Sequence, residues 1–186
     1  MFRRLRRLFV ALVVLIIVIV ALVVVLGNRS ALDDARSRVD ARWAALRAPL
    51  EPRYKQLAVL NTALANDLGA NAVVPARLRA ALAQWNTLVA PGHRDPEAEV
   101  AAADPLEGLA GLARVTAQSS DRLKADQALQ AALVDFDKTA PPRLLIDSYN
   151  AAVRTYEHDR TTGVRRVAAA LFGYHARRTF EPAAGA

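Results

Sequence analysis

VDARWAALRAPLEPRYKQLAVLNTAL, residues 39–64, is the stretch that decides the fold. Its large apolar residues lie three or four positions apart, and Arg53 stands where one more apolar residue would continue the row. This spacing places them in one stripe along an α-helix and nearly holds a heptad repeat, as in a coiled coil. Pro49 and Pro52 each remove a backbone donor, so we expect a kink or a break there. The stripe consists of Val39, Trp43, Leu46, Leu50, Leu57, Leu60 and Leu64.

Three further runs have helical periodicity. The first, 78–89, is bounded by Pro75 and by Pro91. We expect a loop over 93–104, followed by a long helix that ends before Pro141. The last run covers 145–171.

The expected start of the long helix is a capping box at residues 104–107. Asp104 can accept from first-turn amides, Pro105 suits the first helical position, and Glu107 can reach back. No segment alternates apolar and polar residues for long enough to indicate a strand. The sequence therefore predicts an all-α fold, an elongated antiparallel bundle of about four helices.

Residues 8–26 read LFVALVVLIIVIVALVVVL, which is 19 residues without a charge, an amide or a proline. As a helix this run reaches roughly 28 Å, close to the roughly 30 Å hydrocarbon core of a bilayer. It exceeds the apolar region of a signal peptide, so we expect a retained single-pass membrane anchor. The expected organisation is a basic flank over 1–7, a transmembrane anchor over 8–27, a helical bundle over 28–181 and a tail over 182–186.

The charges flanking the apolar run predict its orientation. Positive residues beside a membrane span stay in the cytoplasm, so we expect the N-terminus inside and the body outside the plasma membrane. Of the 25 basic residues, 21 remain outside this flank against 18 acidic ones, so little of the net charge of +7 belongs to the body. Nucleic acid is therefore not an expected partner. The flanking arginines are Arg3, Arg4, Arg6 and Arg7.

The sequence offers little catalytic chemistry. With no Cys, it has no disulfide, thiolate metal site or cysteine nucleophile. The three histidines are scattered, and the cluster at 119–121 lacks a nearby histidine. We therefore expect no catalytic, metal-binding or cofactor-binding residue, no cofactor, and a protein that is not an enzyme.

Aromatic residues gather near the C-terminus, where five of the 11 fall within 149–186. We favour core packing as the explanation, with a ligand-binding patch as the alternative. We expect the Asn150 amide to be bonded across helices. The face to test for partner binding comprises Tyr149, Asn150, Tyr156, Phe172, Gly173, Tyr174 and Phe180.

Several of these pieces resemble motifs of the LemA family of bacterial membrane-anchored helical proteins, over residues 8–181. Residues 39–43 are similar to its Val-Asp-x-x-Trp, and 123–126 to its Leu-Lys-Ala-Asn. Residues 149–156 are similar to its Tyr-Asn-x-x-Val-x-x-Tyr-Asn, with Glu157 in place of the last Asn. Residues 171–174 and 180–181 resemble its Phe-Gly-Phe and Tyr-Phe-Glu elements.

The resemblance implies one membrane anchor carrying long antiparallel helices, with no established enzymatic activity. Family descriptions place the short N-terminus outside, which opposes the charge argument. Where the family has Phe-Pro before the last helix, this chain has Gly163 and Val164, so we expect the turn at Gly163.

Three functions follow as hypotheses. The first is a non-catalytic interaction or scaffold module at the bacterial cell envelope, which binds the lipid bilayer and a protein partner. The second is an extracytoplasmic sensor that binds a ligand and signals through a separate membrane partner. A hydrolase or metal enzyme has the weakest support. A homo-oligomer is left open.

Overall fold

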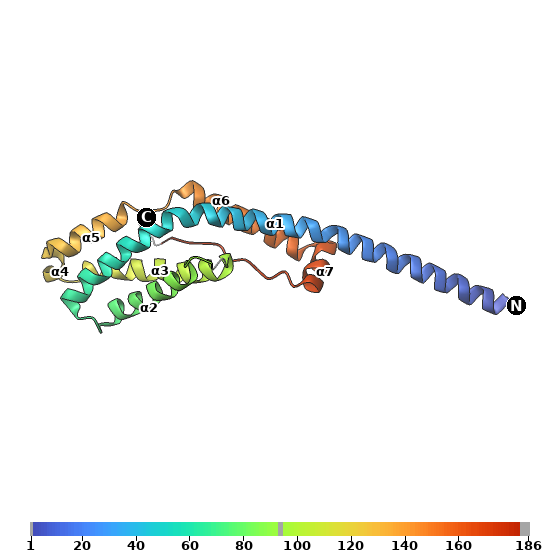
Figure 1. Ribbon diagram of the computed structural model, residues 1–186, viewed down its shortest axis with the longest axis horizontal. Coiled ribbons are helices and arrows are strands. Elements are labelled where there is room, and N and C mark those ends of the chain that lie inside the picture. Colours follow the sequence, from blue (N-terminus) through green and yellow to red (C-terminus); the bar gives the residue numbers. More distant parts are fainter. Residues whose placement is uncertain (1, 93–94, 183–186) are drawn as a thin grey trace.

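α-Helix is the only regular secondary structure over the residues that the computed structural model describes, 2–92 and 95–182 (Figure 1). The side chains of 2–11, 17–18 and 21–22 also lie outside this description. No described residue lies in a β-strand, so the expected all-α class is confirmed. The helices are α1 (Phe2–Leu68), α2 (Val73–Leu88), α3 (Pro96–Ala117), α4 (Asp121–Ala125), α5 (Gln127–Asp137), α6 (Arg143–Thr161) and α7 (Gly163–Phe172).

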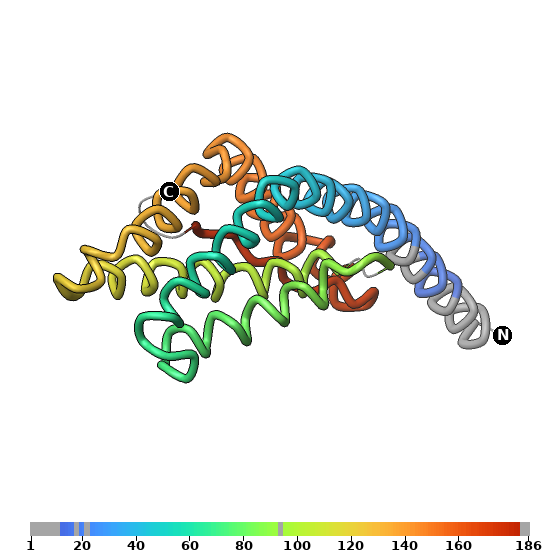
Figure 2. Tube along the Cα trace, turned by 60° about the vertical axis from the view of Figure 1, so that its left-hand side comes forward, coloured from blue at the N-terminus to red at the C-terminus, as the bar shows by residue number. Residues whose placement is uncertain are grey.

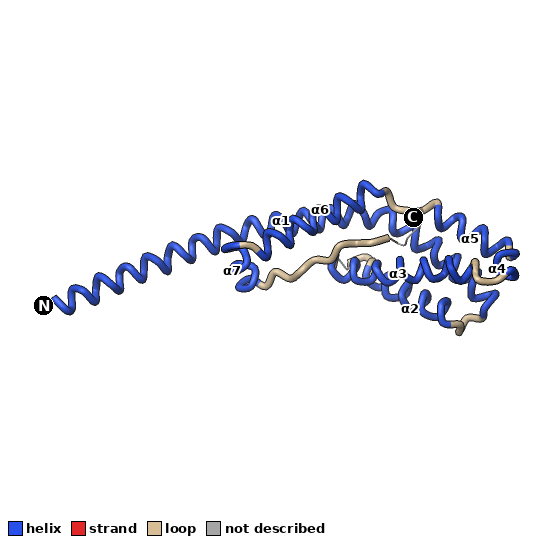
Figure 3. The backbone as a smooth tube through the Cα atoms, turned by 180° about the vertical axis from the view of Figure 1, so that it is seen from behind, coloured by secondary structure: helices blue, strands red, loops and turns tan. Residues whose placement is uncertain are grey.

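The helices form an elongated bundle around the C-terminal half of α1 (Figure 1). Helix α6 runs back along α1, and α2 and α3 form a hairpin on another side. Helices α4 and α5 cover the end of the bundle farthest from the N-terminus (Figure 3). Toward its own N-terminus, α1 continues beyond the other helices as a single rod (Figures 1 and 3).

Helix α1 runs through both prolines without a break. Pro49 and Pro52 lie inside it, and the ribbon bends where its colour passes from cyan to teal (Figure 1). Each proline leaves the carbonyl four residues earlier without a helical partner. Ala45 and Ala48 supply these carbonyls and are exposed, so water can hydrate that face. The expected kink is therefore borne out, and a break at this point is not.

The predicted loop over 93–104 and the predicted start of a helix at Asp104 are wrong. Helix α3 already begins at Pro96, after an N-cap at Asp95. The Asp95 carboxylate accepts from the amides of Glu97 at 3.1 Å and Ala98 at 3.2 Å. The chain thus carries two Asp-Pro pairs, and the first one caps the helix. Pro105 lies inside α3.

The expected single long helix ending before Pro141 is divided into three. Ser119 and Ser120 interrupt it, and the Ser120 hydroxyl caps α4 by accepting from the Leu123 amide at 3.3 Å. Asp126 then caps α5, because its carboxylate accepts from the Leu129 amide at 2.7 Å. The side chains of Ser120 and Asp126 thus bind backbone amides at the points where one helix ends and the next begins. The resulting turns let α5 return toward α1.

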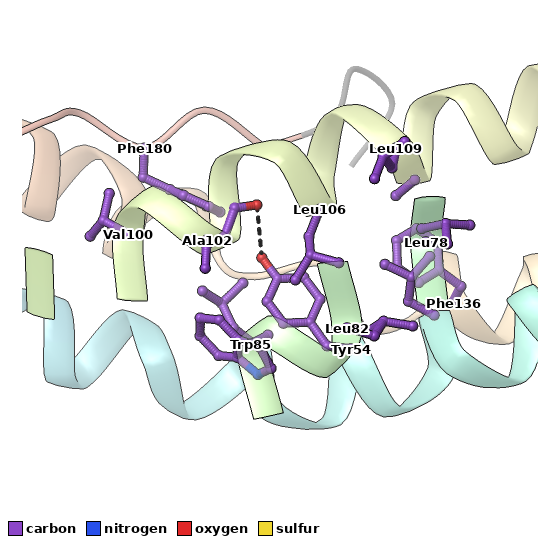
Figure 4. Packing of buried hydrophobic residues seen from close by; sticks show 14 of the residues in the cluster. Tyr54, Leu78, Leu82, Trp85, Val100, Ala102, Leu106, Leu109, Phe136 and Phe180 are labelled. Carbon is purple, nitrogen blue, oxygen red and sulfur yellow. Dashed lines mark hydrogen bonds between the residues drawn. The ribbon is translucent and has the colours of Figure 1, made fainter. Parts of the chain in front are cut away.

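The apolar stripe of α1 forms the centre of the core. All seven of its members are at most 1% exposed. Tyr54 and Trp85 meet edge to face across α1 and α2, with ring centroids 4.8 Å apart. The Tyr54 hydroxyl donates to the Ala103 carbonyl at 3.5 Å, and Figure 4 shows Phe180 entering the same core from the C-terminal segment.

A second, smaller cluster joins α7 to α1. Gly163 begins α7 with φ of 52°, in the left-handed region that glycine tolerates, and this confirms the expected turn. Ala168 and Ala169 pack beside Leu32, and the partly buried Val25 covers the cluster.

The predicted anchor, 8–27, belongs to the helical rod of α1. Its side chains at 8–11, 17–18 and 21–22 lie outside the described residues, as do those of the four flanking arginines. Among the residues that are described, no helix is long and apolar enough to cross a bilayer.

Candidate functional site

The C-terminal residues 174–182, which we call the strap, leave α7 in an extended form and run back along the bundle (Figure 2). An extended segment has backbone donors and acceptors that no helix satisfies. On α6, residues 149, 150, 153, 156 and 157 share one face, because they follow the helical period. This face binds the strap.

Side chains of α6 satisfy the strap backbone. The Tyr156 hydroxyl donates to the His175 carbonyl at 2.8 Å, and the Tyr149 hydroxyl donates to the Arg178 carbonyl at 2.8 Å. Asn150 makes a paired contact with Phe180: its amide nitrogen donates to the carbonyl at 2.9 Å and its oxygen accepts from the amide at 2.8 Å. Asn150 therefore binds the strap rather than another helix, which corrects the expected contact.

Arg177 ties the strap to three helices. Its guanidinium lies 2.9 Å from the Asp40 carboxylate on α1 and 3.7 Å from that of Glu97 on α3. Its backbone amide donates to the Glu157 carboxylate on α6 at 2.6 Å. Arg177 is 8% exposed, so these carboxylates compensate a charge that is largely removed from water.

Aromatic rings complete the binding of the strap. Phe180 is fully buried, and its ring centroid lies 6.0 Å from that of Trp43. The ring centroids of Trp43 and Tyr149 are 5.4 Å apart. The Trp43 indole donates to the buried Glu99 carboxylate at 2.8 Å, and Arg47 lies 3.4 Å from the same carboxylate. Rings from α1, α6 and the strap therefore form one packed group.

Burial further disfavours the ionised form of the tyrosines at this site. Desolvation raises the pKa of Tyr149 and of Tyr156 above the ordinary value, and the nearby Arg177 opposes this only in part. Both hydroxyls thus remain hydrogen-bond donors at physiological pH. Desolvation also raises the pKa of Tyr174, whose hydroxyl donates to Asp33 at 2.5 Å.

A groove of about 720 Å³ lies beside the strap and is lined by both signs of charge. One oxygen of Asp104, on α3, has no hydrogen-bond partner there. Desolvation raises the pKa of Asp104, while Arg178 and the Glu181 backbone lower it. The charged and polar lining residues are Asp104, Arg154, Glu157, Arg177, Arg178, Thr179 and Glu181.

A second charged group lies within the bundle, between α1 and α3. The Arg53 guanidinium binds both carboxylate oxygens of Glu107, at 2.8 and 2.9 Å, and lies 4.0 Å from the centroid of the Phe136 ring. Both charged side chains are 1% exposed. Glu107 thus serves as the partner of Arg53 rather than as part of a helix cap, which corrects the capping-box prediction.

The seven residues expected to form an interaction face do not form one exposed surface. Tyr149, Tyr156, Tyr174 and Phe180 are buried, so core packing is confirmed for these four. Asn150 is half-buried against the strap. Phe172 and Gly173 are exposed at the end of α7, where partner binding stays a prediction.

Sequence reasoning missed the polar anchors of the strap, Asp40, Glu157 and Arg177. Judged from its neighbours in the sequence alone, Glu157 is typical of a solvated helix face. The available signal was the distance of eight residues from Tyr149 to Glu157, which places both on one face of a helix. No signal of that kind marks Arg177, because the strap lacks a helical period.

The site shows no arrangement for holding a metal ion. Over the described ranges, no three His, Cys, Asp or Glu side chains gather in a suitable geometry. Comparison with protein-family models, curated proteins and solved structures finds no match to this chain.

Proposed function

We propose that the protein is a single-pass, membrane-anchored helical bundle of the LemA type, and that it acts as a non-catalytic interaction or scaffold module at the bacterial cell envelope. Residues 8–27 anchor it in the plasma membrane. Arg3, Arg4, Arg6 and Arg7 hold the N-terminus in the cytoplasm, and the bundle lies outside.

The observation that carries this proposal is the exposure of apolar side chains on the rod of α1. Between residues 12 and 26, the exposed large apolar side chains range from 38% at Val13 to 63% at Val23. A helix that is apolar on all sides requires an apolar environment. A bilayer supplies that environment along the whole uncharged run of 19 residues.

The bundle supports a binding role rather than a catalytic one. Its polar residues with the greatest burial hold the fold together, as Arg53 holds Glu107 and Arg177 holds Asp40. Anchoring a rigid body at a surface raises the local concentration of any partner, so modest contacts give useful avidity. Tethering is therefore the mechanism that we propose.

The groove beside the strap favours a second candidate, a sensor that binds a small ligand and signals through a separate membrane partner. Its converging charges, including Asp104 and Arg154, are typical of a pocket that orients a polar ligand. A small molecule that raises the melting temperature of the full chain, but not of an Arg154→Ala variant, would favour the sensor over the scaffold.

Crosslinking in intact membranes, followed by mass spectrometry, tests the scaffold. We expect crosslinks from the bundle to particular envelope proteins, at sites that recur between preparations. The proposal would be contradicted if crosslinks formed only at the lipid-facing residues of the rod and the purified chain also turned over a substrate.

The absence of cysteine makes orientation simple to measure. A Val134→Cys variant carries one thiol, on an exposed position of α5. We expect a membrane-impermeant maleimide to label it in sealed spheroplasts. Labelling that appears only after lysis would place the bundle in the cytoplasm, as the opposite orientation requires.

A further inference from the structure

Helix α7 has an exposed apolar face that no other described element covers. Val164, Val167 and Leu171 lie on one face, because they are separated by three and four residues. They are 45%, 51% and 68% exposed. The packed face of α7 is different: it consists of Ala168 and Ala169, which contact α1. The exposed face is therefore not needed to hold α7 in place.

The position of α7 along α1 indicates what covers this face. Its cluster includes Leu32 and the partly buried Val25, and Val25 belongs to the uncharged apolar run. Leu32 lies six positions after Leu26, the last residue of that run, which is about 9 Å along a helix. The headgroup region on each side of a bilayer has a similar depth of about 5 to 8 Å. Helix α7 thus lies where the rod leaves the bundle (Figures 1 and 3).

The charges around α7 suit the same environment. Arg165 and Arg166 follow Val164, and Arg165 also pairs with Asp159 of α6. Arg29 of α1 pairs with Asp33 at 3.7 Å and lies 5.1 Å from the centroid of the Phe172 ring. Basic residues beside an apolar helical face are typical of helices that lie in a membrane interface and contact anionic headgroups. The charge and the apolar face are therefore both complementary to the same surface.

We propose that α7 is an interfacial helix that inserts Val164, Val167 and Leu171 into the surface of the bilayer, at the base of the bundle. The inference rests on the proposed membrane anchor and extends it. With two attachments, the anchor and α7, the bundle is held at a fixed height and tilt above the membrane. Attachment through the rod of α1 alone would let the height and tilt change as the rod moves in the bilayer.

Paired cysteine variants of the full chain test this inference. Val167→Cys places a thiol on the exposed face of α7, and Val134→Cys places one at the far end of the bundle, at a valine of nearly equal exposure, 51% against 53%. Each thiol is labelled with an environment-sensitive fluorophore. The proteins are reconstituted in phosphatidylcholine vesicles that contain phosphatidylglycerol, with or without a nitroxide near the start of the acyl chain.

We expect the Val167 probe to emit at shorter wavelength than the Val134 probe, and the nitroxide lipid to quench it several-fold more strongly. Equal, water-like emission from both probes in protein that floats with the vesicles would overturn the inference and leave the anchor standing. Shielding of the Val167 probe that rises with protein density, without nitroxide quenching, would assign the face to a second copy and also overturn it. Protein that fails to float would remove the anchor and this inference together.

Discussion

The two halves of α1 belong to one helix, yet they use apolar residues in opposite ways. In the half nearer the N-terminus, Leu12, Leu15 and Ile19 are each more than half exposed. In the bundle half, Leu46 and Leu57 are fully buried. The first half is apolar on every side, whereas the second places most of its large apolar residues in one stripe.

This difference shows that the arrangement of apolar residues, rather than their number, indicates the partner of a helix. A stripe of apolar residues spaced three or four positions apart packs against neighbouring helices, and the opposite face of the helix stays in water. An unbroken apolar surface offers no polar face to water, so it fits a lipid environment. The predictions below test the contrast between these halves and the contacts that depend on it.

The largest effect is expected at Arg53, the charged residue within the stripe. Arg53→Ala leaves the buried Glu107 without its guanidinium partner, so we expect a loss of about 3 to 5 kcal/mol in the free energy of unfolding. Urea unfolding in detergent, followed by circular dichroism, measures it. The double variant Arg53→Met with Glu107→Leu is the control and should recover most of the loss. A single variant as stable as the wild type would contradict the assigned role.

The next effect compares the two halves directly with the same substitution. Leu57→Ala removes a fully buried side chain and should cost about 2 to 5 kcal/mol. Leu15→Ala, at a side chain that is 54% exposed, should change the same unfolding transition by less than about 0.5 kcal/mol. Equal losses in detergent-solubilised protein would show that both halves pack against protein, and the contrast would fail.

The helical parts of the fold were predictable because their signal is local. The stripe of α1 and the run ending at Val89 follow from spacing alone, and Gly163 marks a real helix start. Pro75 lies in the first turn of α2, which begins at Val73. The choice between Asp95 and Asp104 as a cap was not predictable. Both precede a proline, and only the burial of residues such as Val100 and Ala103 decides that the helix begins at the first.

A third prediction concerns the strap, whose attachment depends on the bundle half of α1. Asn150→Ala removes two hydrogen bonds to Phe180, so we expect a loss of about 1 to 3 kcal/mol and faster trypsin cleavage after Arg178. Asn86→Ala, at an exposed position of α2, is the matched control. Cleavage at the wild-type rate in both variants would mean that Asn150 does not hold the strap.

The smallest effect is expected at Asp104. Because burial raises its pKa, the folded state favours the protonated acid. The stability that the protonated Asp104 contributes to the fold is fully present below the ordinary pKa of about 3.9. It is lost as the pH rises through the higher pKa of the folded state. Asp104→Asn should therefore melt slightly above the wild type at neutral pH. The two melting temperatures should converge near pH 4, and an unchanged difference would contradict the assignment.

The strap site was predictable only in part, for a physical reason. Tyr149, Asn150 and Tyr156 share a helical face, so their grouping was visible in the sequence. Their partner was not, because the strap is extended and offers mainly backbone atoms, which any sequence provides. Some of the residues that gave the LemA resemblance, namely Asp40, Trp43 and Phe180, lie in or beside this segment.

Flotation of the full chain with phospholipid vesicles, after an alkaline carbonate wash, tests the central claim most directly. We expect the protein to rise through a sucrose gradient with the lipid, while a variant carrying Ile16→Lys and Ile19→Lys is recovered from the wash. Wild-type protein that remains in the dense fraction, with its helical circular dichroism intact, would show that the apolar half of α1 does not anchor the bundle in a bilayer.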